Sequence, residues 1–290
     1  MHIVANTANE LFKKACNNVM LHGEDVSPRG LPIKEVMCAL LELNWPKHRI
    51  ITLPSRNLNM RYLIGELCFY LSSSKDLRFI SHYSKFWNAV SDDGVHVNSG
   101  YGAYLFRSGT GIDYAVRCLE KDRDSRKAVV PIYSAWDHSK ESNDNPCTMY
   151  VQFLIRKGRL FMITNMRSND LWFGLSYDLP FFTLVQEIVL LKLLRTYPDL
   201  ILGSYLHHVG SLHIYQKNFE QAAAVTADTS VTAACTSPDL SSVDLSSWFA
   251  QLLGWEYFYR TGYRDREMLM RSPPTDFQDW AIEILSKERK

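Results

Sequence analysis

Two short apolar segments joined by a two-residue turn constrain the fold of this chain more than any other feature. Residues 150–155 (YVQFLI) and 160–164 (LFMIT) are rich in aromatic and branched side chains, and Lys157 and Gly158 lie between them. Segments of this length around a glycine-containing turn are typical of a β-hairpin. The hairpin places Cys147, just before the first strand, beside Arg167, at the end of the second.

The pairing of Cys147 with Arg167 makes a candidate reactive site. A nearby positive charge favours the thiolate over the thiol, so Arg167 favours a nucleophilic role for Cys147. An arginine at that place also suits an anionic ligand. A single cysteine before a strand is more often a small buried hydrophobic residue, and that alternative stays open.

The composition is that of a globular protein with one large core or two smaller ones. The chain has 290 residues, of which 46% are hydrophobic and 22% charged, and we expect one domain over residues 1–290. No apolar run approaches the roughly eighteen residues of a membrane span, and residues 1–20 lack a secretory-signal pattern, so we expect a cytoplasmic protein. A net charge of +1 gives no general attraction to nucleic acid, which favours a nucleotide over a polymer as the anionic partner.

The cysteines and histidines argue against a disulfide framework and against a metal site. The six cysteines are scattered without a CxxC pair, and His207 and His208 are adjacent instead of four residues apart. We therefore expect reduced thiols and no metal. The cysteines are Cys16, Cys38, Cys68, Cys118, Cys147 and Cys235.

Three segments have the periodicity of amphipathic helices, namely residues 7–21, 32–44 and 56–72. Pro32 suits the first turn of the second helix. The third helix is the clearest, and it carries Glu66. This carboxylate is either a surface glutamate beside the core or a desolvated acid with a raised pKa, suited to moving protons near neutral pH.

Further along the chain we expect a strand over residues 128–133, an apolar helix over 183–195, and a turn into a strand over residues 209–215. Arg126 and Lys127 belong to a charge run before the first of these strands. Such a run is usually a solvated turn, and it can also supply two cations to a phosphate.

The last part of the chain carries less information. Residues 221–247 are rich in Ala, Ser and Thr, which indicates a surface insertion or a mobile loop. Asp276 is a candidate cap for a final helix over residues 277–287.

Taken in order, these motifs resemble the thymidylate synthase superfamily, and within it the deoxycytidylate hydroxymethylases of large phages and their relatives that act on CMP. The resemblance runs from about Arg29 to Phe219. Its elements are the Arg29-Gly30 loop, a helix carrying Glu66, Trp87, the Tyr101-Gly102 turn, Asp124-Ser125-Arg126, Cys147, Arg167-Ser168 with Asp170, Gly174, and His213 with Tyr215.

The resemblance implies an α+β fold, thymidylate synthase-like, with a large twisted mixed β-sheet, flanking helices and a homodimer packed sheet to sheet. It implies a nucleoside monophosphate and 5,10-methylenetetrahydrofolate as substrates, and neither a nucleic acid polymer nor a membrane as partner. The catalytic residues would be the nucleophile Cys147 and the proton-relay carboxylate Glu66, with Tyr101 and Asp178. The phosphate would be bound by Arg29, Arg167 and Ser168 of one subunit and by Arg126 and Lys127 of the other. The sugar hydroxyl would be held by His213 and Tyr215, and the folate would lie against Asp170, Trp87 and Gly174.

Residues 174–178 distinguish the base that this chain would recognise. Thymidylate synthase has a Gly-Leu-Pro-Phe-Asn segment whose asparagine recognises uracil, whereas this chain reads Gly174-Leu175-Ser176-Tyr177-Asp178. A carboxylate accepts a hydrogen bond from the N4 amino group of cytosine, so Asp178 indicates cytosine. The alternative is an ordinary aspartate in a turn before Pro180.

Other departures from thymidylate synthase agree with hydroxymethylation. Thr148 and Met166 stand where thymidylate synthase has histidine and glutamine, and residues 285–290 lack the apolar terminus that closes over folate in that enzyme. A site that favours reduction has to exclude water, whereas a hydroxymethylase has to admit it.

The reaction that the resemblance implies is transfer of a hydroxymethyl group to C5 of a cytidine 5′-monophosphate through a Cys147 adduct at C6. Two other readings stay open, namely a folate-dependent methyltransferase giving 5-methylcytidylate or thymidylate, and a nucleotide-binding relative without activity. Lys127 replaces an arginine that is usual in the deoxynucleotide enzymes, while Ser168 follows their pattern, so dCMP is favoured and CMP is not excluded.

Overall fold

The computed structural model describes residues 1–134, 141–230, 240, 244–262, 265, 267, 273 and 274. The chain forms two compact units. The sheet unit comprises Met1–Leu58, Ile112–Ser134 and Cys147–Ser237, and the helical unit comprises Asn59–Gly111, Ala135–Pro146 and Pro238–Lys290. The single domain that we expect from the composition stays a prediction.

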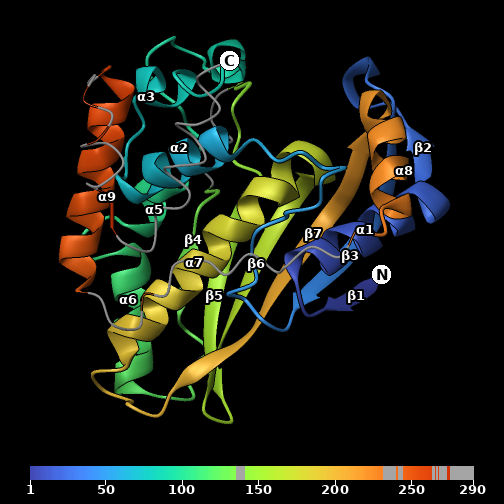
Figure 1. Cartoon of the computed structure of the whole chain (residues 1–290). Helices are drawn as coiled ribbons and strands as arrows, with labels where there is room; N and C mark the ends of the chain where they lie inside the picture. Colours follow the sequence, from blue (N-terminus) through green and yellow to red (C-terminus); the bar gives the residue numbers. More distant parts are fainter. Residues whose placement is uncertain are drawn as a thin grey trace. The chain divides into compact units, whose positions relative to one another are not determined.

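The sheet unit is built on a seven-stranded mixed sheet in the order β1-β3-β7-β6-β5-β4, with β2 paired to β3 (Figure 1). Parallel pairs are β1 with β3 and β6 with β7, and the other pairs are antiparallel. The α+β fold with a mixed sheet and flanking helices is therefore confirmed. The strands are β1 (His2–Ala5), β2 (Glu24–Val26), β3 (Ile33–Leu43), β4 (Val129–Pro131), β5 (Thr148–Arg156), β6 (Arg159–Asp170) and β7 (Ile201–Tyr215).

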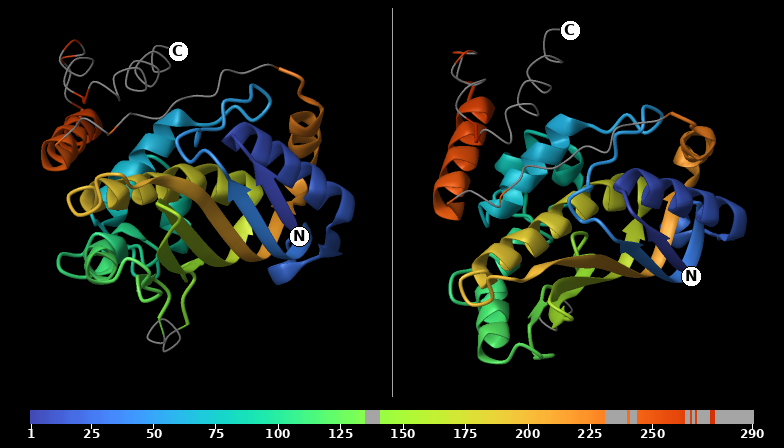
Figure 2. Two further views of the ribbon diagram at one scale, coloured as in Figure 1. Left: turned by 90° about the horizontal axis from the view of Figure 1, so that it is seen from below. Right: turned by 60° about the horizontal axis from the view of Figure 1, so that its bottom comes forward.

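Three helices of the sheet unit cover one face of its sheet. Figure 2 shows α1, α7 and α8 on the same side of the strands. Their side chains form the core with the buried positions of the sheet, where each fully buried leucine or phenylalanine contributes roughly 2 kcal/mol of hydrophobic free energy. The helices and helical turns are α1 (Ala8–His22), η1 (Pro28–Gly30), α6 (Gly111–Lys121), η3 (Leu171–Leu175), α7 (Ser176–Leu193), η4 (Gln216–Asn218) and α8 (Phe219–Ala227).

The predicted hairpin is confirmed as β5 and β6. The strands pair in antiparallel register up to Arg156 opposite Arg159, and Lys157 and Gly158 form the turn with φ values of 50° and 71°. Positive φ at both turn residues matches the right-handed twist of the strands, and glycine adopts it without steric cost.

The predicted helix over residues 32–44 is wrong, because this segment is strand β3. It pairs with β7 along most of its length and with β1 over Leu40–Leu43. From Ala39 onward its buried residues alternate with half-buried ones, which is the period of a strand. Pro32 misled the sequence argument, because proline is tolerated before a strand as well as in the first turn of a helix.

The helix predicted over residues 7–21 is confirmed as α1, capped by Thr7, whose side chain accepts from the N–H of Glu10. The helix predicted over 183–195 exists but begins at Ser176, so Asp178 lies in the first turn of α7 and not in a separate turn before Pro180. Of the turn and strand predicted over residues 209–215, the strand is confirmed and the turn is wrong, since β7 runs unbroken from Ile201 to Tyr215. Gly210 allows a close strand contact there: an added Cβ would lie 2.9 Å from the carbonyl oxygen of Arg167.

The apolar stretch Leu171–Leu193 is the one described helical segment long and apolar enough to cross a membrane. Of its most apolar window, 89% is buried inside the protein. A core helix of a soluble protein meets the same criterion, so this stretch is weak evidence for a membrane.

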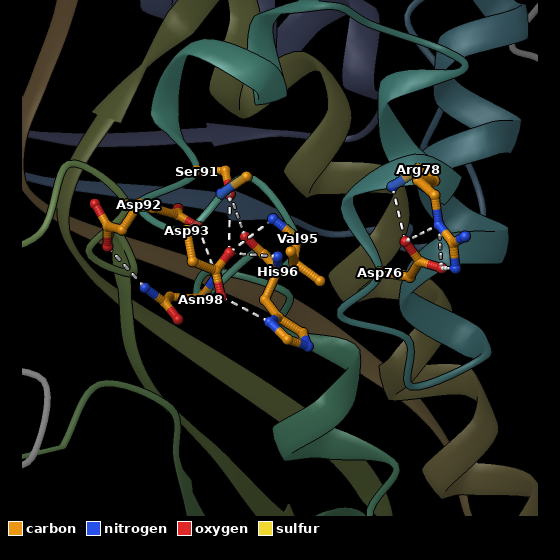
Figure 3. Close-up of polar contacts among 10 residues, drawn as sticks. Asp76, Arg78, Ser91, Asp92, Asp93, Val95, His96 and Asn98 are labelled. Carbon is orange, nitrogen blue, oxygen red and sulfur yellow. Dashed lines mark hydrogen bonds and ion pairs between the residues drawn. The ribbon is translucent and has the colours of Figure 1, made fainter.

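The helical unit contains α2 (Met60–Leu71), α3 (Leu77–Ser81), α4 (Phe86–Val90), α5 (Gly102–Leu105) and α9 (Leu245–Arg260). The helix predicted over residues 56–72 is confirmed as α2, with Asn59 as its cap. Figure 3 shows a polar part of this unit, where Asp93 accepts from the backbone N–H groups of Val95 and His96. These bonds fix the loop before the Tyr101-Gly102 turn.

The segment predicted as an insertion or mobile loop, residues 221–247, is helical at both ends of its described part. Residues 221–227 belong to α8, and α9 begins at Leu245. Residues 231–239 and 241–243, and the helix predicted over 277–287, lie outside the described residues.

Candidate functional site

Cys147 and Arg167 are neighbours in the sheet unit, as the hairpin predicts. Cys147 immediately precedes β5 and is half-buried, and its carbonyl oxygen accepts a hydrogen bond of 2.9 Å from the N–H of Arg167. The register of β5 against β6 shifts between Thr148 and Tyr150, so the strand is irregular directly after the cysteine. Such irregularities redirect side chains next to active sites.

The ends of the parallel strands β6 and β7 bring four further candidates together. Ser168 lies opposite Ser211, and Asp170 lies opposite His213. The rings of His213 and Tyr215 are 5.2 Å apart and nearly perpendicular. The candidate phosphate and sugar residues of β6 and β7 therefore lie on adjacent strands.

Asp170 ends β6 and caps the helical turn η3. Its carboxylate accepts from the N–H groups of Trp172 and Phe173 at 2.9 and 3.2 Å. Burial raises the pKa of Asp170, and the backbone N–H groups together with the positive potential of His213 and Lys217 oppose that rise. A carboxylate has about four lone-pair directions, so two backbone bonds leave it able to accept from a ligand.

Asp178 is buried, with 8% of its surface exposed. Its Oδ2 accepts a hydrogen bond of 2.7 Å from Nδ2 of Asn169. Burial raises the pKa of Asp178 to about 7, and the bond from Asn169 opposes the rise. Gly174 makes room for this pair, because a Cβ there would lie 2.6 Å from Asn169 Nδ2.

The three remaining basic candidates of the sheet unit are exposed. Arg29 lies in η1 with φ of 56° and ψ of 27°, next to Gly30 with φ of 75°. A left-handed arginine costs about 1 kcal/mol, and such strain is frequent where a side chain is held for a ligand. Arg126 and Lys127 lie in the loop before β4, where the carbonyl of Arg126 accepts from Gln152 of β5.

Glu66, Trp87 and Tyr101 belong to the helical unit and are joined there by two tyrosines. Glu66 is buried, with 8% exposure, and its Oε1 accepts from the hydroxyl of Tyr62 at 2.7 Å and from that of Tyr70 at 3.4 Å. Trp87 Nε1 donates to the Tyr62 hydroxyl at 3.2 Å, and the ring of Tyr70 stacks on Tyr101 at 5.2 Å. The surface-glutamate reading is wrong, because the carboxylate is a buried acceptor.

Sequence reasoning missed Tyr62, Tyr70 and Asn169. The two tyrosines flank Glu66 at four residues on either side, which places all three on one face of α2, and this spacing was a usable signal. Asn169 had no such signal, because its partner Asp178 is on another element.

A family model for thymidylate synthase matches residues 10–242 of the chain. The chain belongs to the thymidylate synthase family. The match includes every candidate residue described above and excludes α9, which starts beyond its end.

The chain is similar to several phage hydroxymethyltransferases. The chain is 28% identical over 233 residues to the deoxyuridylate hydroxymethyltransferase of Bacillus phage SP01, an alignment covering 76% of this chain and 59% of the relative. It is 32% identical over 179 residues to the deoxycytidylate 5-hydroxymethyltransferases of Enterobacteria phages T4 and T2, covering 56% of this chain and 70% of each relative. The two kinds of relative are named for different bases.

Proposed function

We propose that this protein transfers a hydroxymethyl group from 5,10-methylenetetrahydrofolate and water to C5 of a cytidine 5′-monophosphate, with dCMP favoured and CMP possible. The products are the 5-hydroxymethylated nucleotide and tetrahydrofolate. Family membership and the names of the relatives support one-carbon transfer to a pyrimidine nucleotide. The observation that carries the choice of base is the buried carboxylate of Asp178.

Asp178 is an acceptor at the position where thymidylate synthase has an amide. With Oδ2 occupied by Asn169, Oδ1 remains to accept from the N4 amino group of cytosine. The O4 oxygen of uracil offers only lone pairs to the same atom, and two facing acceptors repel each other. An ionised Asp178 therefore favours cytosine.

Deoxyuridylate is the second candidate substrate, and two observations favour it. The SP01 relative is named for deoxyuridylate. Asp178 has a pKa of about 7, so a protonated fraction is present at neutral pH, and a protonated carboxyl can donate to O4 of uracil.

The residues of the sheet unit suit the two substrates. Arg167 and Ser168 offer donors to a phosphate, and His213 with Tyr215 offers polar groups to a sugar hydroxyl. Asp170 retains acceptor capacity for the amino and N–H groups of a pterin, and Phe173 beside it is 56% exposed and presents an aromatic ring. The residues present therefore fit methylenetetrahydrofolate, which supplies the one-carbon unit when bound.

In the proposed reaction the Cys147 thiolate adds to C6 of the base, forming a C–S bond and making C5 nucleophilic. C5 forms a bond to the one-carbon unit. Glu66 then accepts the C5 proton through water, and the electron pair of the C5–H bond forms an exocyclic methylene as the carbon–nitrogen bond to the folate breaks and tetrahydrofolate leaves. Water then adds to the exocyclic methylene carbon. The C–S bond breaks and returns the electron pair to Cys147.

A homodimer packed sheet to sheet is also part of the proposal. The sheet face opposite α1 and α7 carries half-exposed apolar side chains in adjacent rows, with Leu154 opposite Phe161 and Ile163 opposite Leu206. Contiguous apolar surface on a sheet face is typical of a protein interface.

The test is release of tritium from C5-labelled dCMP, CMP, dUMP and UMP in the presence of methylenetetrahydrofolate, with mass analysis of the product. We expect release from a cytidine nucleotide, a mass gain of one CH2O and no dihydrofolate. A gain of one CH2 with dihydrofolate would make the protein a methyltransferase. No release from any of the four nucleotides would contradict an enzymatic role, and Cys147→Ala is the control for chemistry that does not depend on the adduct.

A further inference from the structure

A line of buried polar side chains leads from the interior of the sheet to Asp178. Asn169 Nδ2 donates to Asp178 Oδ2 at 2.7 Å, and Asn169 Oδ1 lies 3.2 Å from His207 Nε2. His207 Nδ1 lies 2.8 Å from the hydroxyl of Tyr205, which in turn lies 2.9 Å from Thr164 Oγ1. Thr164, Tyr205 and His207 have no exposed surface and Asn169 has 3%.

The carboxylate fixes the direction of every bond in this line. An ionised Asp178 accepts only, so the amide of Asn169 must present Nδ2 to it and Oδ1 to His207. His207 then has to carry its proton on Nε2 and donate to Oδ1, which leaves Nδ1 to accept from Tyr205. The hydroxyl proton of Tyr205 is thereby used, so Thr164 must donate to Tyr205.

The protonation states of His207 and Tyr205 are consistent with this direction of the hydrogen bonds. Burial lowers the pKa of His207 to about 3, with a smaller contribution from His208, so the imidazole is neutral with one donor and one acceptor. Burial also raises the pKa of the Tyr205 phenol, which keeps its proton available for donation.

The fold assembles this line from three elements. Thr164 and His207 are direct neighbours on β6 and β7, and α7 crosses these strands with Asp178 in its first turn (Figure 1). Gly174 leaves the space in which the Asn169 amide reaches Asp178. The polar groups are thus placed on a rigid sheet, and their hydrogen bonds to one another offset the free-energy cost of burying five polar side chains.

We propose that four positioning residues form a one-way hydrogen-bond relay that holds Oδ2 of Asp178, so that only Oδ1 contacts the base. These residues are Thr164, Tyr205, His207 and Asn169. This inference rests on the proposed function, because it assigns the base preference to the relay as well as to Asp178. When the relay is cut at Tyr205, Nδ1 of His207 loses its donor, and the hold of His207 and Asn169 on Oδ2 of Asp178 is weakened. The carboxylate then loses its held orientation.

The experiment cuts the relay at its far end and reads the tautomer directly. Long-range 1H–15N NMR of the full chain at pH 8, where Asp178 with its pKa of about 7 is ionised, assigns the protonated ring nitrogen of His207 without any substrate. We expect Nε2–H in the wild type and in Tyr205→Phe, in which Asn169 Oδ1 still accepts from Nε2, and a mixture of tautomers in Asp178→Asn, which removes the carboxylate that orients this amide. Thr164→Val is the second variant that cuts the relay, and Thr164→Ser is the conservative variant that should retain it.

The same variants are then compared in tritium release from C5-labelled dCMP and dUMP. We expect the ratio of kcat/KM for dCMP over dUMP to fall about tenfold in Tyr205→Phe and Thr164→Val, as for loss of one buried hydrogen bond, and to be retained in Thr164→Ser. Tyr197→Phe is the matched control, because the Tyr197 hydroxyl donates to the Leu119 carbonyl at 2.8 Å in the same unit and lies outside the relay.

The outcomes separate this inference from the proposed function. An Nδ1–H tautomer in the wild type would overturn the relay, and so would an unchanged nucleotide ratio in both cutting variants of an active enzyme. If the wild type releases no tritium from either nucleotide, the proposed function fails, and the NMR result still decides whether the one-way relay exists.

Discussion

At the scale of single residues, Asp178 is the side chain to which the proposed function assigns the choice of base. Replacing it with asparagine keeps the shape and exchanges an acceptor for an amide, which can donate to O4 of uracil. We expect Asp178→Asn to shift the ratio of kcat/KM for dCMP over dUMP toward uracil by about ten- to hundredfold, the usual range for discrimination by one base contact. Tritium release from the two labelled nucleotides measures the ratio, and an unchanged ratio would show that Asp178 does not contact the base.

Asp178 also links stability to pH. Its pKa is about 7 in the folded protein and roughly 3.9 in an unfolded chain, so between these values the folded state binds the proton more tightly. The free energy of unfolding therefore falls as pH rises from about 4 to 7, by an amount on the order of 4 kcal/mol, and is constant above pH 7. The neighbouring ionisable groups, Tyr205 and His207, stay neutral over this range.

The measurement for this linkage is urea unfolding of the wild type and Asp178→Asn at pH 5 and pH 8. The asparagine variant lacks the titrating group, so its stability relative to the wild type should be higher at pH 8 than at pH 5. An identical difference at the two pH values would mean that Asp178 is not held neutral in the folded state.

The sequence analysis named most of the candidate site residues but not the side chains that form hydrogen bonds with them. Cys147 and Arg167 were placed together because a hairpin has only one pairing that uses Lys157 and Gly158 as its turn. Asn169 was not identified, because the alternation of buried residues along β6 shifts by one position after Met166 and brings Asn169 to the buried face. A strict two-residue period places it on the other side.

At the scale of elements, helix α2 presents Tyr62, Glu66 and Tyr70 on one face and uses the first tyrosine to connect Glu66 with Trp87. Tyr62→Phe removes the 2.7 Å bond to Glu66 and the acceptor for the Trp87 indole N–H. We expect kcat to fall about tenfold with little change in nucleotide KM, because the hydrogen bond that orients Glu66, the proposed proton-transfer residue, is lost.

Tyr70→Phe is the matched comparison for this change. Its bond to Glu66 is longer, at 3.4 Å, so the loss of kcat should be smaller than in Tyr62→Phe. Tritium release at saturating nucleotide measures both. Equal losses in the two variants, or a change confined to KM, would contradict a role for Tyr62 in holding Glu66.

The predictions of helices and strands from local hydrophobic periodicity were right where that periodicity had one interpretation. Helix α2 has apolar residues at helical spacing. The prediction starts this helix at residue 56, whereas the structure starts it at Met60, after the cap Asn59. Segment 32–44 has a mixed pattern, and its state is decided by β7 and β1, which lie far away in the sequence and supply the backbone partners of Ile33–Leu43. Non-local pairing of this kind leaves little trace in a local window.

At the scale of the whole molecule, the proposed homodimer predicts that each site needs residues of two chains. Under this proposal Cys147 acts in one subunit together with Arg126 and Lys127 of the partner. The exposed position of Arg126 and Lys127 in the loop before β4 is consistent with that use. The apolar sheet face around Ile163 and Leu206 would be the contact.

Mixing two inactive variants tests this arrangement without any structural assumption about the interface. Cys147→Ala lacks the nucleophile and Arg126→Ala lacks the partner's cation, so each homodimer should have no tritium release above a few per cent of the wild type. Unfolding and refolding an equal mixture produces heterodimers in half of the dimers, and one of the two sites in each heterodimer has both residues intact. We expect about a quarter of the wild-type activity to return. Mixing without unfolding is the control, and no recovery after refolding, with heterodimers verified by differently tagged subunits, would show that Arg126 serves the site of its own chain.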